Sequence, residues 1–241
     1  MLWLIGGTSE SREIAKLLFQ NDIDFLVTVT TQEALSLYKD LPIKVNVGIL
    51  TVGKIQDLID DYGIEKIVDA SHPHAQIISQ HAINLNLPYL RYERSVLIQS
   101  TGKKIENIDA LFAGKYLTGK RALLTIGYKG LARFEPWQSK AILFTRILPS
   151  ITSLKAAIDA GFTSDRIVAL RPPIGLELER SLWTRWKIEV VVTKANGYTG
   201  EEDIKQQLSQ ELNIELIVLD RPKINYPRQC NQLEDVLNFC A

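Results

Sequence analysis

The sequence predicts an α/β protein of two Rossmann-like lobes, each with a mostly parallel five-stranded sheet, and a ligand cleft between the lobes. Short apolar runs alternate with segments that carry apolar residues at helical spacing, and the runs lack the polar alternation of a half-exposed sheet. The pattern stops at the polar stretch 99–104 and then begins again. We therefore expect a first lobe over residues 1–96 and a second over residues 97–241.

Each lobe contains five runs with strand character. The expected strands of the first lobe are 2–5, 25–30, 44–47, 66–70 and 88–92, with helices at 9–20, 52–62 and 75–86. Those of the second lobe are 122–126, 142–147, 167–170, 188–193 and 216–219, with helices at 153–160, 176–186, 201–212 and 232–239. Parallel strands joined by right-handed crossovers place ligand sites at their carboxyl ends, so the strand-to-helix turns carry the functional information.

The length and composition are those of an ordinary globular protein. The chain has 241 residues, 46% of them hydrophobic, which is enough to bury a core without disulfides or metals. Its formal net charge of zero gives no sign of a nucleic acid or a membrane surface as a partner. The sequence shows neither a signal peptide nor an apolar run that could span a bilayer, and the two cysteines lack metal-ligand spacing. We expect a cytoplasmic protein.

The turn after the first strand is typical of a phosphate site. Gly6 and Gly7 allow the backbone to approach a ligand, and the N–H groups at the start of the next helix favour an anion. Thr8 and Ser9 add hydroxyl groups, and Arg12 follows one turn later. The third glycine of the dinucleotide fingerprint is absent, so a plain turn capped by Thr8 is the alternative.

The end of the second strand favours NADP over NAD. NAD sites carry a carboxylate at this place to bind the ribose 2′-hydroxyl, whereas this chain has Thr30 and Thr31, with Glu33 close behind. Hydroxyl groups tolerate a 2′-phosphate better than a carboxylate does. The alternative is that the two threonines only cap the next helix.

The turn after the fourth strand contains Ser71, His72, Pro73 and His74. A histidine at a strand end can contact a ligand or supply a proton. A metal site would need further ligands, which the surrounding sequence does not offer. We therefore expect a polar contact to cofactor or substrate.

Basic residues follow several other strands. Arg91, Tyr92 and Arg94 end the first lobe, where they form either an anion clamp or a solvated cluster of salt bridges. In the second lobe the basic residues at strand ends are Lys129, Arg146, Arg171 and Lys194. A cleft with this lining suits a large polycarboxylate.

Taken together, the turns at 6–12, 69–75, 91–94, 125–127, 192–197 and 220–222 resemble, in order and spacing, the precorrin-6A reductase family. The resemblance spans nearly the whole chain. It implies NADPH-dependent reduction of one double bond in a corrin precursor of cobalamin biosynthesis, with or without cobalt in the ring. The chain departs from the family pattern at 171–175, where many members have Gly-Pro-Phe, and at Ser95, where proline is common.

The resemblance and the turns together give each residue an expected role. The catalytic candidates are His72, Tyr92 and Lys194. The residues expected to bind NADPH are Gly6, Gly7, Thr8, Ser9, Glu10, Arg12, Thr30, Thr31 and Ser71. Those expected to pair with substrate carboxylates are Arg91, Arg94, Lys129, Arg146 and Arg171. No metal is expected, and the partners would be the tetrapyrrole substrate and neighbouring pathway enzymes.

Two other functions fit parts of the pattern. A cofactor-free tetrapyrrole enzyme similar to uroporphyrinogen-III synthase would also have two α/β lobes, although the glycine turn at the first strand argues against it. A non-catalytic NADPH-binding sensor would have the same turn but would turn nothing over. NADPH oxidation separates the reductase from both, and NADPH binding separates the sensor from the cofactor-free enzyme.

Overall fold

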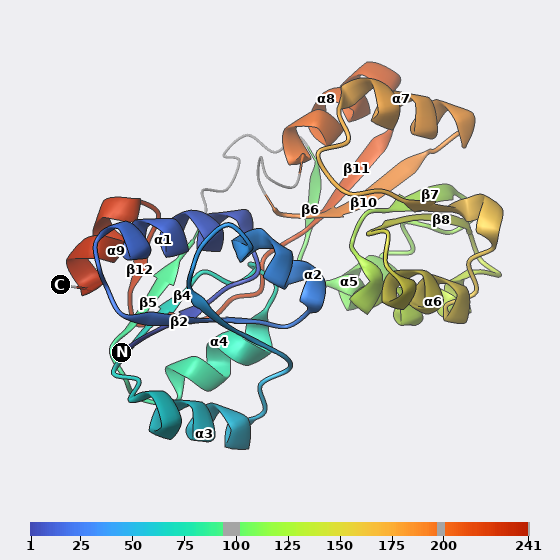
Figure 1. Cartoon of the computed structure of the whole chain (residues 1–241). Helices are drawn as coiled ribbons and strands as arrows, with labels where there is room; N and C mark the ends of the chain where they lie inside the picture. Colours follow the sequence, from blue (N-terminus) through green and yellow to red (C-terminus); the bar gives the residue numbers. More distant parts are fainter. Residues whose placement is uncertain (94–101, 197–200, 241) are drawn as a thin grey trace. The chain divides into compact units, whose positions relative to one another are not determined.

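The computed structural model describes residues 1–93, 102–196 and 201–240. The chain divides into two compact units, one of Met1–Ser95 with Pro222–Ala241 and one of Val96–Arg221. Within the described residues, each unit contains a six-stranded sheet in which every pair of neighbouring strands is parallel (Figure 1). The α/β fold is therefore confirmed, with six strands per sheet where five were expected.

The first sheet has the order β3-β2-β1-β4-β5-β12. Its strands are β1 (Leu2–Ile5), β2 (Phe25–Val29), β3 (Lys44–Val47), β4 (Lys66–Asp69), β5 (Tyr89–Tyr92) and β12 (Gln229–Cys230). The chain runs outward from β1 in one direction, then returns to place β4 on the other side of β1. The carboxyl ends of β1 and β4 therefore meet at a topological switch point, where open α/β sheets bind ligands.

Helices cover both faces of this sheet. They are α1 (Ser9–Gln20), α2 (Gln32–Leu35), α3 (Val52–Tyr62), α4 (Gln76–Ile83) and α9 (Leu233–Cys240), with the short 3₁₀ helix η1 (Ser36–Tyr38). Helices α1 and α9 lie on one face, and α3 and α4 on the other (Figure 1). Alternation along β1 explains the division, because Leu2 and Leu4 join the core under α1 and α9, whereas Trp3 and Ile5 join the core under α3 and α4.

The C-terminal segment belongs to the first unit, which corrects the boundary expected from the sequence. Strand β12 pairs with β5, α9 packs on α1, and Val236 of α9 is fully buried. The Lys66 ammonium donates to the carbonyl of Cys240 at 3.1 Å, close to the end of α9. The apolar stripe of α9 predicts a helix, but a stripe does not indicate which of two sheets it covers.

The second sheet has the order β6-β11-β10-β7-β8-β9. Its strands are β6 (Lys103–Ile105), β7 (Arg121–Leu124), β8 (Ile142–Ile147), β9 (Ile167–Ala169), β10 (Val190–Lys194) and β11 (Glu215–Leu219). Its helices are α5 (Ile108–Ala113), η2 (Tyr128–Trp137), α6 (Ile151–Asp159), η3 (Ser164–Arg166), α7 (Leu176–Arg185) and α8 (Glu202–Leu212). Strand β6 was not expected, because two of its three residues are exposed lysines at the end of a polar stretch.

The second unit also buries both faces of its sheet. Ala122 and Leu124 of β7 belong to one core cluster, and Leu123, between them, packs against Trp183 and Trp186 on the other side. None of the helices described is long and apolar enough to cross a membrane.

Candidate functional site

The carboxyl edge of the first sheet contains a small pocket at the switch point between β1 and β4. It is a shallow hollow open to solvent, with a cavity volume of about 10 Å³. Its lining residues come from the turns after β1 and β4, the first turn of α1 and the end of β5: Thr8, Glu10, Ala70, Ser71, Pro73, Arg91 and Tyr92. Five of these residues, all but Ala70 and Pro73, were expected to contact cofactor or substrate, and the structure brings them together.

The β1–α1 turn is held by a reciprocal cap. Thr8 is the N-cap of α1, its hydroxyl accepts from the Ser11 N–H at 3.1 Å, and its own N–H donates to the Ser11 hydroxyl at 2.9 Å. The Thr8 hydroxyl also donates to the Ala70 carbonyl at 2.8 Å. The turn after β1 is therefore tied to the turn after β4, across the switch point.

The N–H groups of the three turn residues all donate within the protein. In the order Gly6, Gly7 and Thr8, their acceptors are the Thr28 carbonyl, the Tyr38 hydroxyl and the Ser11 hydroxyl. Ser9 is the first residue of α1 and is exposed. Its N–H has no acceptor within the helix, because no helical turn precedes it. An anion at this edge would thus meet the helix start rather than the glycine N–H groups.

The two glycines are needed for the shape of the turn. A Cβ atom on Gly6 would lie 2.4 Å from the Tyr38 hydroxyl and 3.0 Å from Val27, so any other residue would force the turn or Tyr38 to move. Gly7 has a φ of +101°, which side-chain-bearing residues rarely adopt, and a Cβ there would meet nothing closer than Ala34 at 3.9 Å. The face of the turn at Gly7 is therefore open to a ligand.

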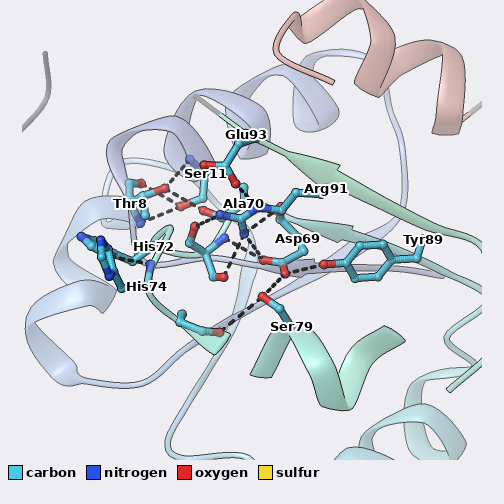
Figure 2. Close-up of polar contacts among 12 residues, drawn as sticks. Thr8, Ser11, Asp69, Ala70, His72, His74, Ser79, Tyr89, Arg91 and Glu93 are labelled. Carbon is cyan, nitrogen blue, oxygen red and sulfur yellow. Dashed lines mark hydrogen bonds and ion pairs between the residues drawn. The ribbon is translucent and has the colours of Figure 1, made fainter. Parts of the chain in front are cut away.

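A buried carboxylate organises the turn after β4. Asp69 is fully buried, and its Oδ1 accepts from the Ser71 N–H at 2.9 Å and from Arg91 Nη1 at 2.8 Å. Its Oδ2 accepts from the hydroxyls of Ser79 and Tyr89, each at 2.6 Å (Figure 2). All four groups donate to the carboxylate, which fixes the backbone at Ser71 and the strand end at Arg91.

Arg91 lies inside this network, with its side chain 1% exposed. Its guanidinium donates to Asp69, to the hydroxyl and carbonyl of Ser71, and through Nε to Glu93 at 2.8 Å (Figure 2). Burial lowers the pKa of Arg91, but the charges of Asp69 and Glu93 more than offset this, so the pKa is raised overall. Arg91 was expected to pair with a substrate carboxylate. In the structure its guanidinium already donates to Asp69, Ser71 and Glu93.

Burial and the charge of Asp69 both raise the pKa of Tyr89, which keeps its hydroxyl protonated as a donor. The ring of Tyr226 stacks on Tyr89 and lies 5.3 Å from the Arg91 guanidinium carbon. Tyr226 comes from the C-terminal segment, so this segment covers the network as well as completing the sheet.

His72 is exposed on the turn, next to the pocket residue Ser71. Its Nδ1 accepts from the His74 N–H at 3.2 Å, so in the neutral ring Nε2 bears the proton and acts as a donor. The part of the chain that the structure describes has no group of three or more histidines, cysteines or carboxylates able to hold a metal.

The end of β2 also lies at this edge of the sheet. Thr31 is the N-cap of α2 and its hydroxyl accepts from the Ala34 N–H at 3.2 Å, whereas Thr30 is exposed. Arg12 is half-exposed on α1, where its guanidinium contacts Glu13 at 2.9 Å and Asp40 at 3.9 Å. Thr31 therefore caps α2, which was the alternative to cofactor binding. Of the two threonines, Thr30 is the one whose exposure allows contact with a ligand.

The remaining expected residues belong to the second unit or to undescribed parts of the chain. Lys194 ends β10, and burial, then the nearby charge of Lys129, lowers its pKa. Arg146 is mostly buried and pairs with Glu179 of α7, while Arg171 is exposed. Arg94 lies outside the described residues.

Sequence reasoning missed Asp69, Tyr89 and Tyr38. Asp69 carries a signal, since a carboxylate at the end of an apolar strand is unusual, and such a residue needs a buried partner. Tyr38 carries none, because its contacts are with residues 27 and 31 positions away.

The strand order and the helix start at the switch point define the first unit as a Rossmann-like α/β unit. A family model, described as precorrin-6x reductase CbiJ/CobK, matches residues 1–241, and the chain belongs to this family of reductases. The resemblance found in the sequence is therefore confirmed.

Curated relatives and a solved structure agree with this family. The cobalt-precorrin-6A reductase of Synechocystis sp. is 43% identical, and the match covers 99% of this chain and 95% of the relative. That of Priestia megaterium is 30% identical, and the match covers 99% of this chain and 97% of the relative. The precorrin-6A reductase of Rhodobacter capsulatus is 24% identical over the whole chain. A solved structure of CobK precorrin-6A reductase has the same fold, with a TM-score of 0.78 at 21% identity over 99% of this chain and 94% of that one.

Proposed function

We propose that this protein reduces one ring double bond of cobalt-precorrin-6A with NADPH, in cobalamin biosynthesis. The observation that carries the proposal is the pocket at the switch point, where the start of α1 meets the Asp69-centred turn. Family membership supplies the reaction class. The cobalt form is chosen because the relatives at 43% and 30% identity are named for it, whereas the relative at 24% is named for the metal-free ring.

The donors at this edge fit a dinucleotide. The open face at Gly7 and the exposed start of α1 at Ser9 suit a pyrophosphate, because helix N-terminal N–H groups favour anions. Thr30 offers a hydroxyl where an NAD site has a carboxylate. The carboxylate of Glu10 suits a hydroxyl group of the cofactor or substrate, since it would repel a phosphate.

NADPH supplies a hydride when bound, and the chain positions the reactants and provides a proton. His72, with a proton on Nε2, and Tyr92 in the pocket are the candidate donors in the first unit. In the second unit, Lys194 is the third candidate, and the exposed side chains of Lys129 and Arg171 would pair with substrate carboxylates.

The cofactor part of the proposal predicts that NADPH binds more tightly than NADH, and that Thr30→Asp lowers NADPH affinity about tenfold, roughly 1.4 kcal/mol. The new carboxylate would repel the 2′-phosphate but accept a hydrogen bond from the 2′-hydroxyl of NADH. Titrations that follow nucleotide fluorescence measure both affinities.

Thr118→Asp is the matched control, because Thr118 is exposed in the second unit. It should leave both affinities unchanged. Equal or tighter binding of NADH by the wild-type protein would reject the assignment of NADPH.

A further inference from the structure

Tyr38 is a buried tyrosine that touches the β1–α1 turn from a distant part of the sequence. It ends η1, in the segment that follows β2, and is 2% exposed. Its hydroxyl lies 3.0 Å from the Gly7 nitrogen and 2.6 Å from the Ser11 hydroxyl. The same hydroxyl occupies the space that a Cβ atom of Gly6 would fill.

The hydrogen bonds around Tyr38 have a defined direction. The Ser11 hydroxyl donates its one proton to the Thr8 carbonyl at 2.7 Å, so in its contact with Tyr38 it must accept. The Tyr38 hydroxyl therefore donates to Ser11 and accepts from the Gly7 N–H. Burial raises the pKa of Tyr38, so the phenol keeps the proton that this direction requires.

The same chain of contacts continues across the switch point. Ser11 and Thr8 cap each other, and the Thr8 hydroxyl donates to the Ala70 carbonyl at 2.8 Å. Four linked residues thus connect the segments that follow β2, β1 and β4. Ala70 is next to Asp69 in the sequence. The turn after β4 is therefore held both by this series of hydrogen bonds and by the Asp69 network.

We propose that Tyr38 is a positioning residue for the cofactor: it fixes the β1–α1 turn against the segment after β2, so that the pyrophosphate and ribose subsites keep a constant separation. The inference rests on the proposed NADPH site. Tyr38 is buried behind the turn and would not touch the cofactor itself. Its effect should therefore be the same for NADPH and NADH, because both have the pyrophosphate and they differ only at the 2′-position.

The test is Tyr38→Phe, which removes the hydroxyl and keeps the ring. Dissociation constants for NADPH and NADH should both rise three- to tenfold, about the effect of one hydrogen bond between neutral groups. The ratio of the two constants should stay at its wild-type value, whereas Thr30→Asp should change it. In turnover, KM for NADPH should rise and kcat should change little.

Ser11→Ala interrupts the same series of hydrogen bonds at the next residue after Tyr38. Its effect on cofactor affinity should not add to that of Tyr38→Phe, since residues in one hydrogen-bond network are coupled. Tyr62→Phe is the matched control, a partly buried tyrosine on α3 that packs against the other face of the sheet. It should leave both affinities unchanged, and thermal unfolding should show that all variants are folded.

Unchanged affinity in a folded Tyr38→Phe protein would overturn the positioning role while leaving the proposed function intact. A loss confined to NADPH would also overturn it, because Tyr38 would then belong to the 2′-phosphate subsite. A wild-type protein that binds neither nucleotide would instead contradict the proposed function, and the positioning role with it.

Discussion

Arg91→Ala is expected to lower the free energy of unfolding by about 3–5 kcal/mol, because it removes one partner of a buried ion pair. The side chains of Arg91 and Asp69 are 1% and 0% exposed, and Nη1 lies 2.8 Å from Oδ1. Without the guanidinium, Asp69 keeps its contacts with Ser79 and Tyr89 but remains a buried charge without its cation. Urea denaturation measures the change.

Glu93→Gln is the matched control, since Glu93 contacts the same guanidinium but is 20% exposed. The side-chain carbonyl of the new glutamine can still accept from Arg91 Nε. The free energy of unfolding should therefore fall by about 1 kcal/mol or less. Asp69→Asn combined with Arg91→Ala should cost less than the sum of the single changes. Wild-type stability of Arg91→Ala together with weakened substrate binding would show instead that Arg91 is a substrate clamp.

Gly6→Ala is expected to weaken NADPH binding at least tenfold, about 1.4 kcal/mol, and to lower stability by about 1–3 kcal/mol. The added Cβ would lie 2.4 Å from the Tyr38 hydroxyl, so either the turn or the tyrosine must move. Movement of the turn displaces the start of α1, where we place the pyrophosphate. Nucleotide titration and thermal unfolding measure the two effects.

In the Gly6→Ala protein, Tyr38→Phe should raise the free energy of unfolding rather than lower it. Removing the hydroxyl leaves the Tyr38 ring carbon at 3.3 Å and Val27 at 3.0 Å from the new methyl group, contacts that small shifts can relieve. The double variant should therefore be more stable than Gly6→Ala alone. Gly53→Ala is the control, because a Cβ there meets nothing within 4 Å. Equal cofactor affinity in folded Gly6→Ala and wild-type protein would contradict the placement of the site at this turn.

The fold was largely predictable because its signal is local. Most of the strands of four or more residues are largely apolar runs, and α1, α3 and α9 each carry an apolar stripe. The two strands that were missed, β6 and β12, are three and two residues long, too short to show a pattern. The assignment of α9 also failed, because its stripe fits either sheet until β12 pairs with β5.

The candidate site was predictable in place but not in detail. Parallel strands bring their carboxyl ends to one edge, so the turns that contain Thr8 and Ser71 and the strand end at Tyr92 had to meet there. The sequence could not show which polar groups are turned inward. Arg91, which was expected to bind substrate, is bound to Asp69, and the Gly7 N–H donates to Tyr38, so both groups hold the site together.

The most direct test of the account is to supply cobalt-precorrin-6A, and separately the metal-free ring, with NADPH carrying deuterium at the transferable position. One NADPH should be oxidised for each product formed, the deuterium should appear in the reduced ring, and the cobalt form should react faster. Conversion of the ring without NADPH oxidation would indicate a cofactor-free enzyme. Tight binding of NADPH without oxidation by either ring would indicate a binding protein, and either result would contradict the proposed reduction.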